Sequence, residues 1–234
     1  MKYVYFFTLV IWATTCFANS LDVGLETYKE GDYATAIKIF RPLAEKGDAK
    51  AQNYMGHMFN RGEGTAQDPT QAIKWFRKSA DQGNAIAQLN MGHMYFNPGL
   101  HHDYKQALTW YLKASDYSEH KTEFPNTVLA AELKISEMYH KGLGVPQDLS
   151  EAAAWVRKSA DRGNAQSQYE LALLYLKGEG VPYDIGESKA WLHKAAAQGY
   201  DQARSLLWQS EFNSFTDELY GLNERKRLNL LPSW

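Results

Sequence analysis

Cysteine is almost absent from this chain of 234 residues, in which Cys16 stands alone. A single cysteine cannot form an intramolecular disulfide or build a thiolate zinc cluster, so stability must come from packing. An excess of charge of one sign is also missing, because 25 Lys and Arg residues face 27 Asp and Glu residues, for a formal net charge of -2. That balance gives no reason to expect a nucleic-acid partner. Apolar residues make up 44% of the chain, which is enough for a packed core.

The first 18 residues have the pattern of a secretory signal peptide. Lys2 precedes an almost uninterrupted apolar stretch over residues 3–12, and Cys16 and Ala18 are the small residues expected before a cleavage site. The stretch is shorter than the roughly 20 apolar residues that a transmembrane helix needs. We therefore expect cleavage after Ala18, a periplasmic or secreted mature chain, and no stable membrane insertion after cleavage. A retained membrane anchor is the alternative.

Internal repetition dominates the rest of the sequence, as the match of Ala51 to Gly56 with Ala87 to Gly92 shows. In each copy, apolar and small residues recur at four-residue steps, which predicts one buried face of a helix. These positions hold Ala51, Met55 and Phe59; Ala87, Met91 and Tyr95; Ala131, Ile135 and Tyr139; and Ser167, Leu171 and Tyr175. The residue after the middle position is always small, which indicates a close approach of two helices. It is Gly56, Gly92, Ser136 or Ala172.

A second helix is predicted in every copy after a turn that is rich in glycine in three of the four. It begins at an aspartate that is followed three residues later by Gln or Glu, the pattern of a capping box. In a capping box, the Asp side chain accepts from backbone N–H groups, and the Gln or Glu side chain returns to the Asp backbone. The aspartates are Asp68, Asp103, Asp148 and Asp184. A tryptophan follows at the same place in every copy, which indicates a repeated packing solution. It is Trp75, Trp110, Trp155 or Trp191.

We therefore predict an all-α fold, an α-solenoid of antiparallel helix pairs, because connections this short force neighbouring helices to alternate in direction. The four repeats are expected at 49–84, 85–128, 129–164 and 165–199, with an insertion near 116–127. Residues 19–48 read as a degenerate leading unit, in which Pro42 should kink the helix. Residues 200–234 are expected to form capping helices that close the stack.

At these residues the sequence resembles the Sel-1-like repeat family, a branch of the tetratricopeptide-like helical solenoids. The shared motif is A-x-x-x-L-G-x-x-Y-x-x-G-x-G-V-x-x-D-x-x-x-A-x-x-W-x-x-K-A-A-x-x-G, which is best preserved over residues 131–163 and 167–199. The resemblance implies a curved, right-handed stack that acts as an adaptor. Exported bacterial members are linked to envelope assembly, signalling and encounters with host cells. Since the motif residues are structural, the resemblance implies no active site.

The histidines are the strongest candidates for metal ligands. His57 and His93 occupy equivalent positions in two copies, and His101 and His102 lie in the irregular turn of the second copy. A zinc site needs three or four converging ligands, and no closely spaced His-x-x-x-His or Cys pair is present. We therefore expect no metal and no cofactor.

The glycine turns are not expected to bind phosphate, because they follow helices and lack a closing Lys-Ser or Lys-Thr pair. Carboxylates are available at Glu26, Asp32, Glu137 and Glu170, but none is paired with a histidine at a meaningful spacing. We therefore expect no catalytic residue and no enzymatic activity.

One stripe of the first helices varies between copies, whereas the core positions repeat. Such a stripe of polar, aromatic and charged residues suits the recognition of an extended protein segment, by analogy with other solenoids. An ordinary solvated face is the alternative. The candidate protein-binding residues are Tyr54, His57, Arg61, Asn90, His93, Asn97, Lys134, Glu137, Lys141, Glu170 and Lys177, with Leu173 in line with the last two.

The hypothesis from the sequence is an exported scaffold that binds a protein or peptide partner and no nucleic acid. Two other hypotheses stay open at this point. One is an envelope enzyme that acts on peptidoglycan or a related polymer, and the other is a structural cap of a larger envelope assembly that docks through residues 201–234.

Overall fold

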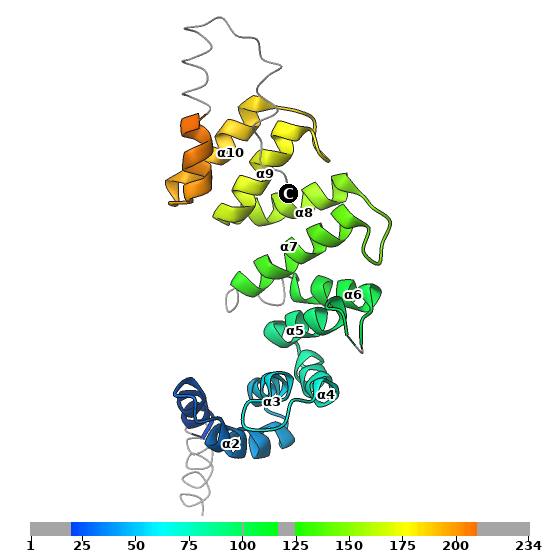
Figure 1. Ribbon diagram of the computed structural model, residues 1–234, viewed down its shortest axis with the longest axis vertical. Helices are drawn as coiled ribbons and strands as arrows, with labels where there is room; N and C mark the ends of the chain where they lie inside the picture. Colours follow the sequence, from blue (N-terminus) through cyan, green and yellow to red (C-terminus); the bar gives the residue numbers. More distant parts are fainter. Residues whose placement is uncertain (1–19, 100, 117–124, 210–234) are drawn as a thin grey trace, which may run out of the picture. The chain divides into compact units, whose positions relative to one another are not determined.

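The computed structural model describes residues 20–99, 101–116 and 125–209, and all regular structure in these ranges is helical (Figure 1). Residues 20–29 and 201–209 are helical at the two ends of this part of the chain. Between them lie α2 (Tyr33–Glu45), α3 (Ala49–Arg61), α4 (Pro69–Ala80), α5 (Ala85–Phe96), α6 (Tyr104–Ala114), α7 (Pro125–Lys141), α8 (Leu149–Asp161), α9 (Ala165–Lys177) and α10 (Ile185–Ala197). The expected signal peptide and most of the expected capping segment lie outside the described residues.

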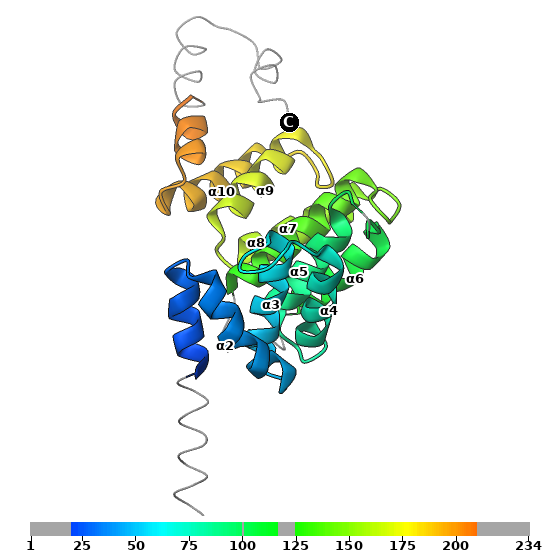
Figure 2. The ribbon, with the colours of Figure 1, turned by 60° about the horizontal axis from the view of Figure 1, so that its bottom comes forward.

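The chain divides into two compact units. The first contains residues 1–138 and 143–145, and the second contains residues 139–142 and 146–234. In the first unit, α2 packs on α3, α3 on α4, α4 on α5, and α5 on α6. In the second, α8 packs on α9 and α9 on α10, as Figure 1 and Figure 2 show. The prediction of an all-α fold built from consecutive, packed helix pairs is confirmed. None of the helices in the described ranges is long and apolar enough to cross a membrane.

Each helix pair is closed by the same backbone hydrogen bond across its turn. The N–H of the N-cap aspartate donates to the carbonyl of an aromatic residue near the end of the first helix, over 2.8 to 3.1 Å. The four pairs are Asp68 with Phe59, Asp103 with Tyr95, Asp148 with Tyr139, and Asp184 with Tyr175. The second copy makes this bond although its turn lacks the glycine pattern. There α5 ends at Phe96, and Asn97 after it is extended because Pro98 disfavours a helical residue before it.

The prediction of a complete capping box is half right. Each N-cap Asp side chain accepts from the backbone N–H three residues later, as expected, for example Asp148 from Glu151 at 3.0 Å. The return contact is a different one, because the N–H of the aspartate is already used in closing the pair. Glu151 accepts instead from Trp155 Nε1 at 2.9 Å, and Glu187 accepts from Trp191 Nε1 at 3.1 Å.

The four tryptophans contribute to the packing as predicted. Trp110 and Trp191 are buried, and Trp75 and Trp155 are half-buried. A lysine three residues later lies over each ring, with its Nζ 3.6 to 4.4 Å from the ring centroid, which gives the motif lysine a cation–π role. These lysines are Lys78, Lys113, Lys158 and Lys194.

The small positions of the first helices are matched in volume to the second helix. A Cβ on Gly56 would come within 2.4 Å of the Phe76 ring, and one on Gly92 within 2.3 Å of the Tyr111 ring. In the fourth copy the small residue is Ala172, and the corresponding second-helix residue in the same core cluster is the aliphatic Leu192. A larger residue on one helix thus goes with a smaller one on the other, as close packing requires.

In the three glycine-rich turns, the second glycine packs against the preceding repeat unit, which the sequence pattern did not reveal. Gly62 and Gly178 end their helices in the left-handed conformation, which glycine adopts readily. Gly64, Gly144 and Gly180 also have positive φ, and each lies against the first turn of a helix in the preceding repeat unit. These helices are α2, α6 and α8, respectively. A Cβ on Gly180 would come within 1.9 Å of the Leu149 carbonyl oxygen. These glycines therefore set the spacing between one repeat and the next.

Buried glutamines also connect neighbouring repeats. The side chain of Gln52 donates to the Ala44 carbonyl at 2.9 Å, at the end of α2. Gln88 and Gln168 repeat this contact with Ala80 and Ala160. Each of these carbonyls also accepts from a glycine N–H of the following turn, so the glutamine amide adds a second hydrogen bond at the end of the helix.

Two helices cover irregular parts of the sequence. Helix α7 begins at Pro125, whereas the third repeat was expected to start at 129, so part of the expected insertion belongs to this helix. Proline suits the first turn of a helix because its missing N–H has no partner there. In the leading unit, α2 contains Pro42 and continues through it to Glu45.

The second copy is expected to gain stability from Gln106→Glu. Trp110 is 3% exposed, and its Nε1 has no hydrogen-bond partner among the described residues. A glutamate there would supply the acceptor that Glu151 and Glu187 supply in the later copies. Satisfying a buried donor should raise the free energy of unfolding by about 1 kcal/mol, measured by urea denaturation. The control is Gln71→Glu, where Trp75 is only half-buried. An equal gain at both positions would contradict this explanation.

Candidate protein-binding surface

The variable stripe of the first helices is called here the first-helix stripe. In the first unit it comprises Tyr54, His57 and Arg61 on α3, Asn90 and His93 on α5 with Asn97 just after it, and Lys134 and Glu137 on α7. Lys141, Glu170 and Lys177 belong to the second unit. Arg61, Asn97 and Lys141 are exposed, and the other members are half-buried.

Tyr54 lies in an aromatic cluster at the beginning of the stripe. Its ring stacks on Phe40 with centroids 4.9 Å apart, and its edge meets Tyr28 at 5.1 Å. The Tyr28 hydroxyl donates to a carboxylate oxygen of Glu63 at 2.5 Å. Burial, followed by this hydrogen bond and the negative charge of Glu63, raises the pKa of Tyr28. Sequence reasoning missed Tyr28 and Glu63, because nothing local connects two residues that are 35 positions apart.

The middle of the stripe is a chain of hydrogen bonds between α3 and α5. Asn90 Nδ2 donates to Asn53 Oδ1 at 3.0 Å and lies 3.1 Å from His57 Nε2. Because an amide nitrogen only donates, His57 Nε2 must be the unprotonated acceptor, so the ring is neutral. Burial, and then the positive charge of Arg61, lower the pKa of His57 to about 4, and the negative charge of Glu63 opposes the shift.

His93 is held in a similar way by its own repeat. Its Nδ1 lies 2.9 Å from the Tyr111 hydroxyl, and the rings meet edge to face at 5.4 Å. Burial, and then the positive charge of Lys134, lower the pKa of His93. Lys134 lies 2.8 Å from a carboxylate oxygen of Glu137 and 4.8 Å from the centroid of the Phe96 ring. The stripe is therefore a row of mostly fixed side chains rather than a freely solvated face.

The members of the stripe in the second unit form a less regular group. Glu170 is half-buried, and burial raises the pKa of its carboxyl, although Gln166 donates to it at 2.8 Å. Leu173 is 2% exposed and belongs to the core, so it adds nothing to this surface.

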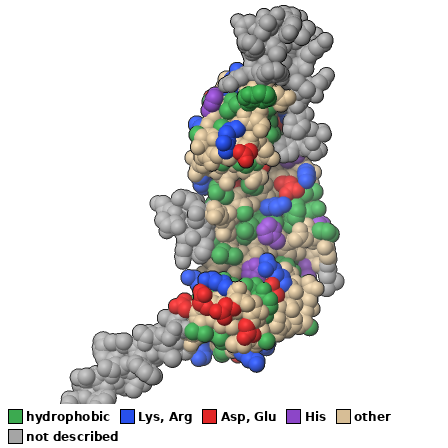
Figure 3. Space-filling model, turned by 60° about the vertical axis from the view of Figure 1, so that its left-hand side comes forward, with side chains coloured by type: hydrophobic (Ala, Val, Ile, Leu, Met, Phe, Trp, Pro, Cys, Tyr) green, Lys and Arg blue, Asp and Glu red, His purple; other side chains and the backbone are tan. Residues whose placement is uncertain are grey.

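The charges of the first-helix stripe are mixed, with Arg61 near Glu63 and Lys134 beside Glu137. Figure 3 shows the same character on one face of the molecule, where basic, acidic and histidine side chains lie among apolar ones. A partner of mixed composition matches such a surface better than a polyanion does.

The other residues considered for chemistry have structural contacts. Asp32 caps α2 by accepting from Thr35, and Glu26 pairs with the exposed Lys29. His101 lies 3.4 Å from the Thr70 hydroxyl, and His102 lies 3.3 Å from the Asn97 carbonyl. Within the described part of the chain, no group of three or more His, Cys, Asp or Glu residues is arranged to hold a metal ion.

The family model described as the Sel1 repeat matches this chain four times, at residues 49–84, 85–116, 129–164 and 165–200. The chain belongs to the Sel1 repeat family. The match to the second repeat ends at residue 116, before the segment that separates it from the third.

Two solved Sel1 repeat structures are about a third identical to this chain in sequence. One is a protective antigen of uropathogenic Escherichia coli strains, 32% identical, with a TM-score of 0.70 over 82% of this chain and 40% of that one. Another is a Sel1 repeat protein from Oxalobacter formigenes, 31% identical, with a TM-score of 0.61 over 74% of this chain and 66% of that one. This Sel1 protein thus spans less than half of the E. coli relative and about two thirds of the Oxalobacter one. The MamA structure, 18% identical with a TM-score of 0.51, shares the fold. No functionally curated protein matches the sequence.

The neutral state of His57 predicts a loss of stability in acid. Its pKa is lowered in the folded chain, so the unfolded chain binds a proton first as the pH falls from 6.5 towards 4. The stabilising contribution is complete above pH 6.5 and is lost over that window. The free energy of unfolding, measured by urea denaturation, should fall between about pH 7 and about pH 4.5. This fall should be about 2 kcal/mol smaller in His57→Gln than in the unmodified chain. His140→Gln, at an exposed position, is the control. The same reduction in the control variant would refute the assignment to His57.

Proposed function

We propose that this Sel1 repeat protein is an exported scaffold that binds an extended segment of another protein through the part of the first-helix stripe that lies in its first unit. Sel1 repeat proteins are generally protein-interaction scaffolds, and this chain has four such repeats. The observation that carries the proposal is the fixed arrangement of half-buried polar and aromatic groups along α3, α5 and α7, with Asn90 hydrogen-bonded across two repeats.

A fixed row of this kind favours binding for an energetic reason. Ordering a side chain at an interface costs about 0.5–1.5 kcal/mol, and much of that cost is already met before a partner arrives. Tyr54, His57 and His93 keep part of their surface accessible although ring contacts or hydrogen bonds hold them. Aromatic groups with one polar edge are the side chains that interfaces use most.

Two observations support export. The first 18 residues have the charge, apolar stretch and small residues of a cleaved signal peptide. The E. coli relative is described as a protective antigen. A protective antigen must be reached by the immune system, and an exported location of the present chain would agree with that role.

The exposed members of the stripe provide the binding test, because Tyr54 and His93 also stabilise the core. A photo-crosslinking benzoylphenylalanine at Arg61 or Asn97 should capture the same partner from an envelope extract. The double variant Arg61→Ala with Asn97→Ala should then raise the dissociation constant for that partner about tenfold or more in a titration. The matched control is Lys74→Ala with Lys105→Ala, at exposed positions on α4 and α6. Equal crosslinking from position 74, or equal weakening by the control variant, would rule out the stripe as the binding surface.

Export has a separate test. The mature protein from the native cell should begin at Asn19, since cleavage is expected after Ala18. Mass spectrometry of the N-terminal peptide in a periplasmic and a secreted fraction measures this directly. The control is an Ala18→Gln variant, which should block cleavage. A mature chain that retains residues 1–18 in the cytoplasm would refute export.

A further inference from the structure

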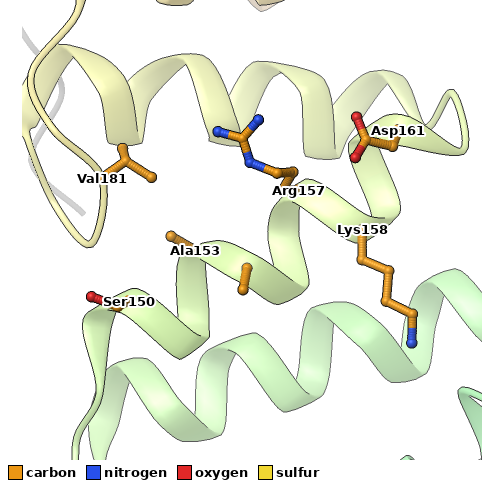
Figure 4. Close-up of a pocket in the computed structure, with 7 residues that line it drawn as sticks. Ser150, Ala153, Arg157, Lys158, Asp161 and Val181 are labelled. Carbon is orange, nitrogen blue, oxygen red and sulfur yellow. The ribbon is translucent and has the colours of Figure 1, made fainter.

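The second unit contains a cavity of about 350 Å³ on the side of α8. Ser150, Ala153, Ala154, Arg157, Lys158 and Asp161 of α8 line it, together with Val181 from the turn that leads to α10. Figure 4 shows the Arg157 guanidinium reaching upward from α8, with Val181 across the space from Ala153. No residue of the first-helix stripe lines this cavity.

Arg157 is the basic group that reaches into this space. It donates to the Tyr175 hydroxyl, and its guanidinium carbon lies 5.5 Å from the centroid of the Tyr175 ring. A guanidinium has five N–H donors, so donors remain for a ligand. Among the described residues no carboxylate forms an ion pair with Arg157. Tyr175 thus orients the guanidinium without neutralising it.

The remaining wall is apolar and shallow. Ala153 is 2% exposed, and Ala154 and Val181 add two further aliphatic side chains. A ligand must therefore present an aliphatic group next to the atoms that Arg157 binds. Lys158 also lines the cavity, but its side chain extends away from Arg157 in Figure 4, and its Nζ lies 4.3 Å from the centroid of the Trp155 ring.

The first repeat contains the same polar residues at the equivalent positions. Thr70, Arg77, Lys78 and Asp81 correspond to Ser150, Arg157, Lys158 and Asp161. Arg77 likewise donates to the hydroxyl of Tyr95, at 2.8 Å. Ile73 and Lys74 replace Ala153 and Ala154 in the wall, and the turn after α5 lacks the glycine pattern of the turn that holds Val181. The arginine–tyrosine pair is therefore a feature of the repeat architecture, whereas the two alanines and the turn beside them distinguish the cavity of the second unit.

We propose that this cavity binds the C-terminal residue of a protein segment. The terminal carboxylate binds Arg157 through paired N–H donors, the geometry that arginine offers to carboxylates. The aliphatic side chain on the same Cα lies against Ala153, Ala154 and Val181. Asp161, one helical turn from Arg157, disfavours a second negative charge and so excludes a polyanion such as a nucleic acid.

The test uses the full mature chain and two labelled peptides, acetyl-Gly-Gly-Gly-Val with a free carboxylate and the same peptide with a C-terminal amide. Fluorescence anisotropy should give a dissociation constant on the order of 100 μM for the free acid and binding at least about tenfold weaker for the amide. A third peptide, amidated and with an internal glutamate, should bind as weakly as the amide. No binding of the free acid, or binding of either amidated peptide as tightly as the free acid, would overturn the proposal.

Matched variants locate the binding. Arg157→Ala should abolish it, and Ala153→Ile with Ala154→Lys, which copies the wall of the first repeat and keeps Arg157, should abolish it as well. Arg77→Ala, at the equivalent position in the first repeat, should leave the affinity unchanged. Circular dichroism establishes that each variant is folded. Binding that survives in the filled-cavity variant, or falls equally in Arg77→Ala, would overturn the assignment even if Arg157→Ala destabilises the fold.

Discussion

The backbone hydrogen bond from each N-cap aspartate to the first helix is the constraint on which the repeats depend. It closes a pair with turns as different as Gly178-Glu179-Gly180 and the segment after Asn97. Since it uses the aspartate N–H, the residue three positions later is left to bond elsewhere, and in two copies that partner is the tryptophan. The position of the tryptophan then sets where the motif lysine lies over its ring. One bond across the turn thus leaves the glutamate of the third and fourth copies free to bind the tryptophan of its own helix.

Patterns of the sequence predicted the elements of this fold well and their contacts less well. Helices, N-caps and small core positions follow from residue type and spacing, because they depend on neighbours within one or two turns. The capping box failed in its second half because a non-local partner, the Tyr139 or Tyr175 carbonyl, competes for the same N–H. The glycine-rich turns were recognised, but nothing in their spacing showed that Gly180 lies against the Leu149 carbonyl of the preceding repeat. Both misses concern contacts between segments, which spacing along one segment does not encode.

The first-helix stripe shows the same limit. Its members were found because they vary where the core repeats, but their burial was not predictable from that variation. Asn90 reaches Asn53 and His57 only because α3 and α5 lie side by side, and Tyr28 reaches Glu63 across 35 positions. These contacts make His57 neutral and hold Tyr54 in place. They also divide the stripe into fixed, half-buried groups and exposed residues such as Arg61 and Asn97, which can be changed without disturbing the core.

Repetition within one chain gives a means of separating architecture from function. A feature present in equivalent positions of two repeats, such as Arg77 with Tyr95 and Arg157 with Tyr175, needs only the fold as its explanation. A feature present in one repeat alone requires another reason. Ile73 packs against a core cluster of the first unit, whereas the equivalent Ala153 and its neighbour Ala154 carry smaller side chains. Because burial of apolar surface is favourable, a ligand group placed on Ala153, Ala154 and Val181 would gain apolar contacts in the space beside Arg157.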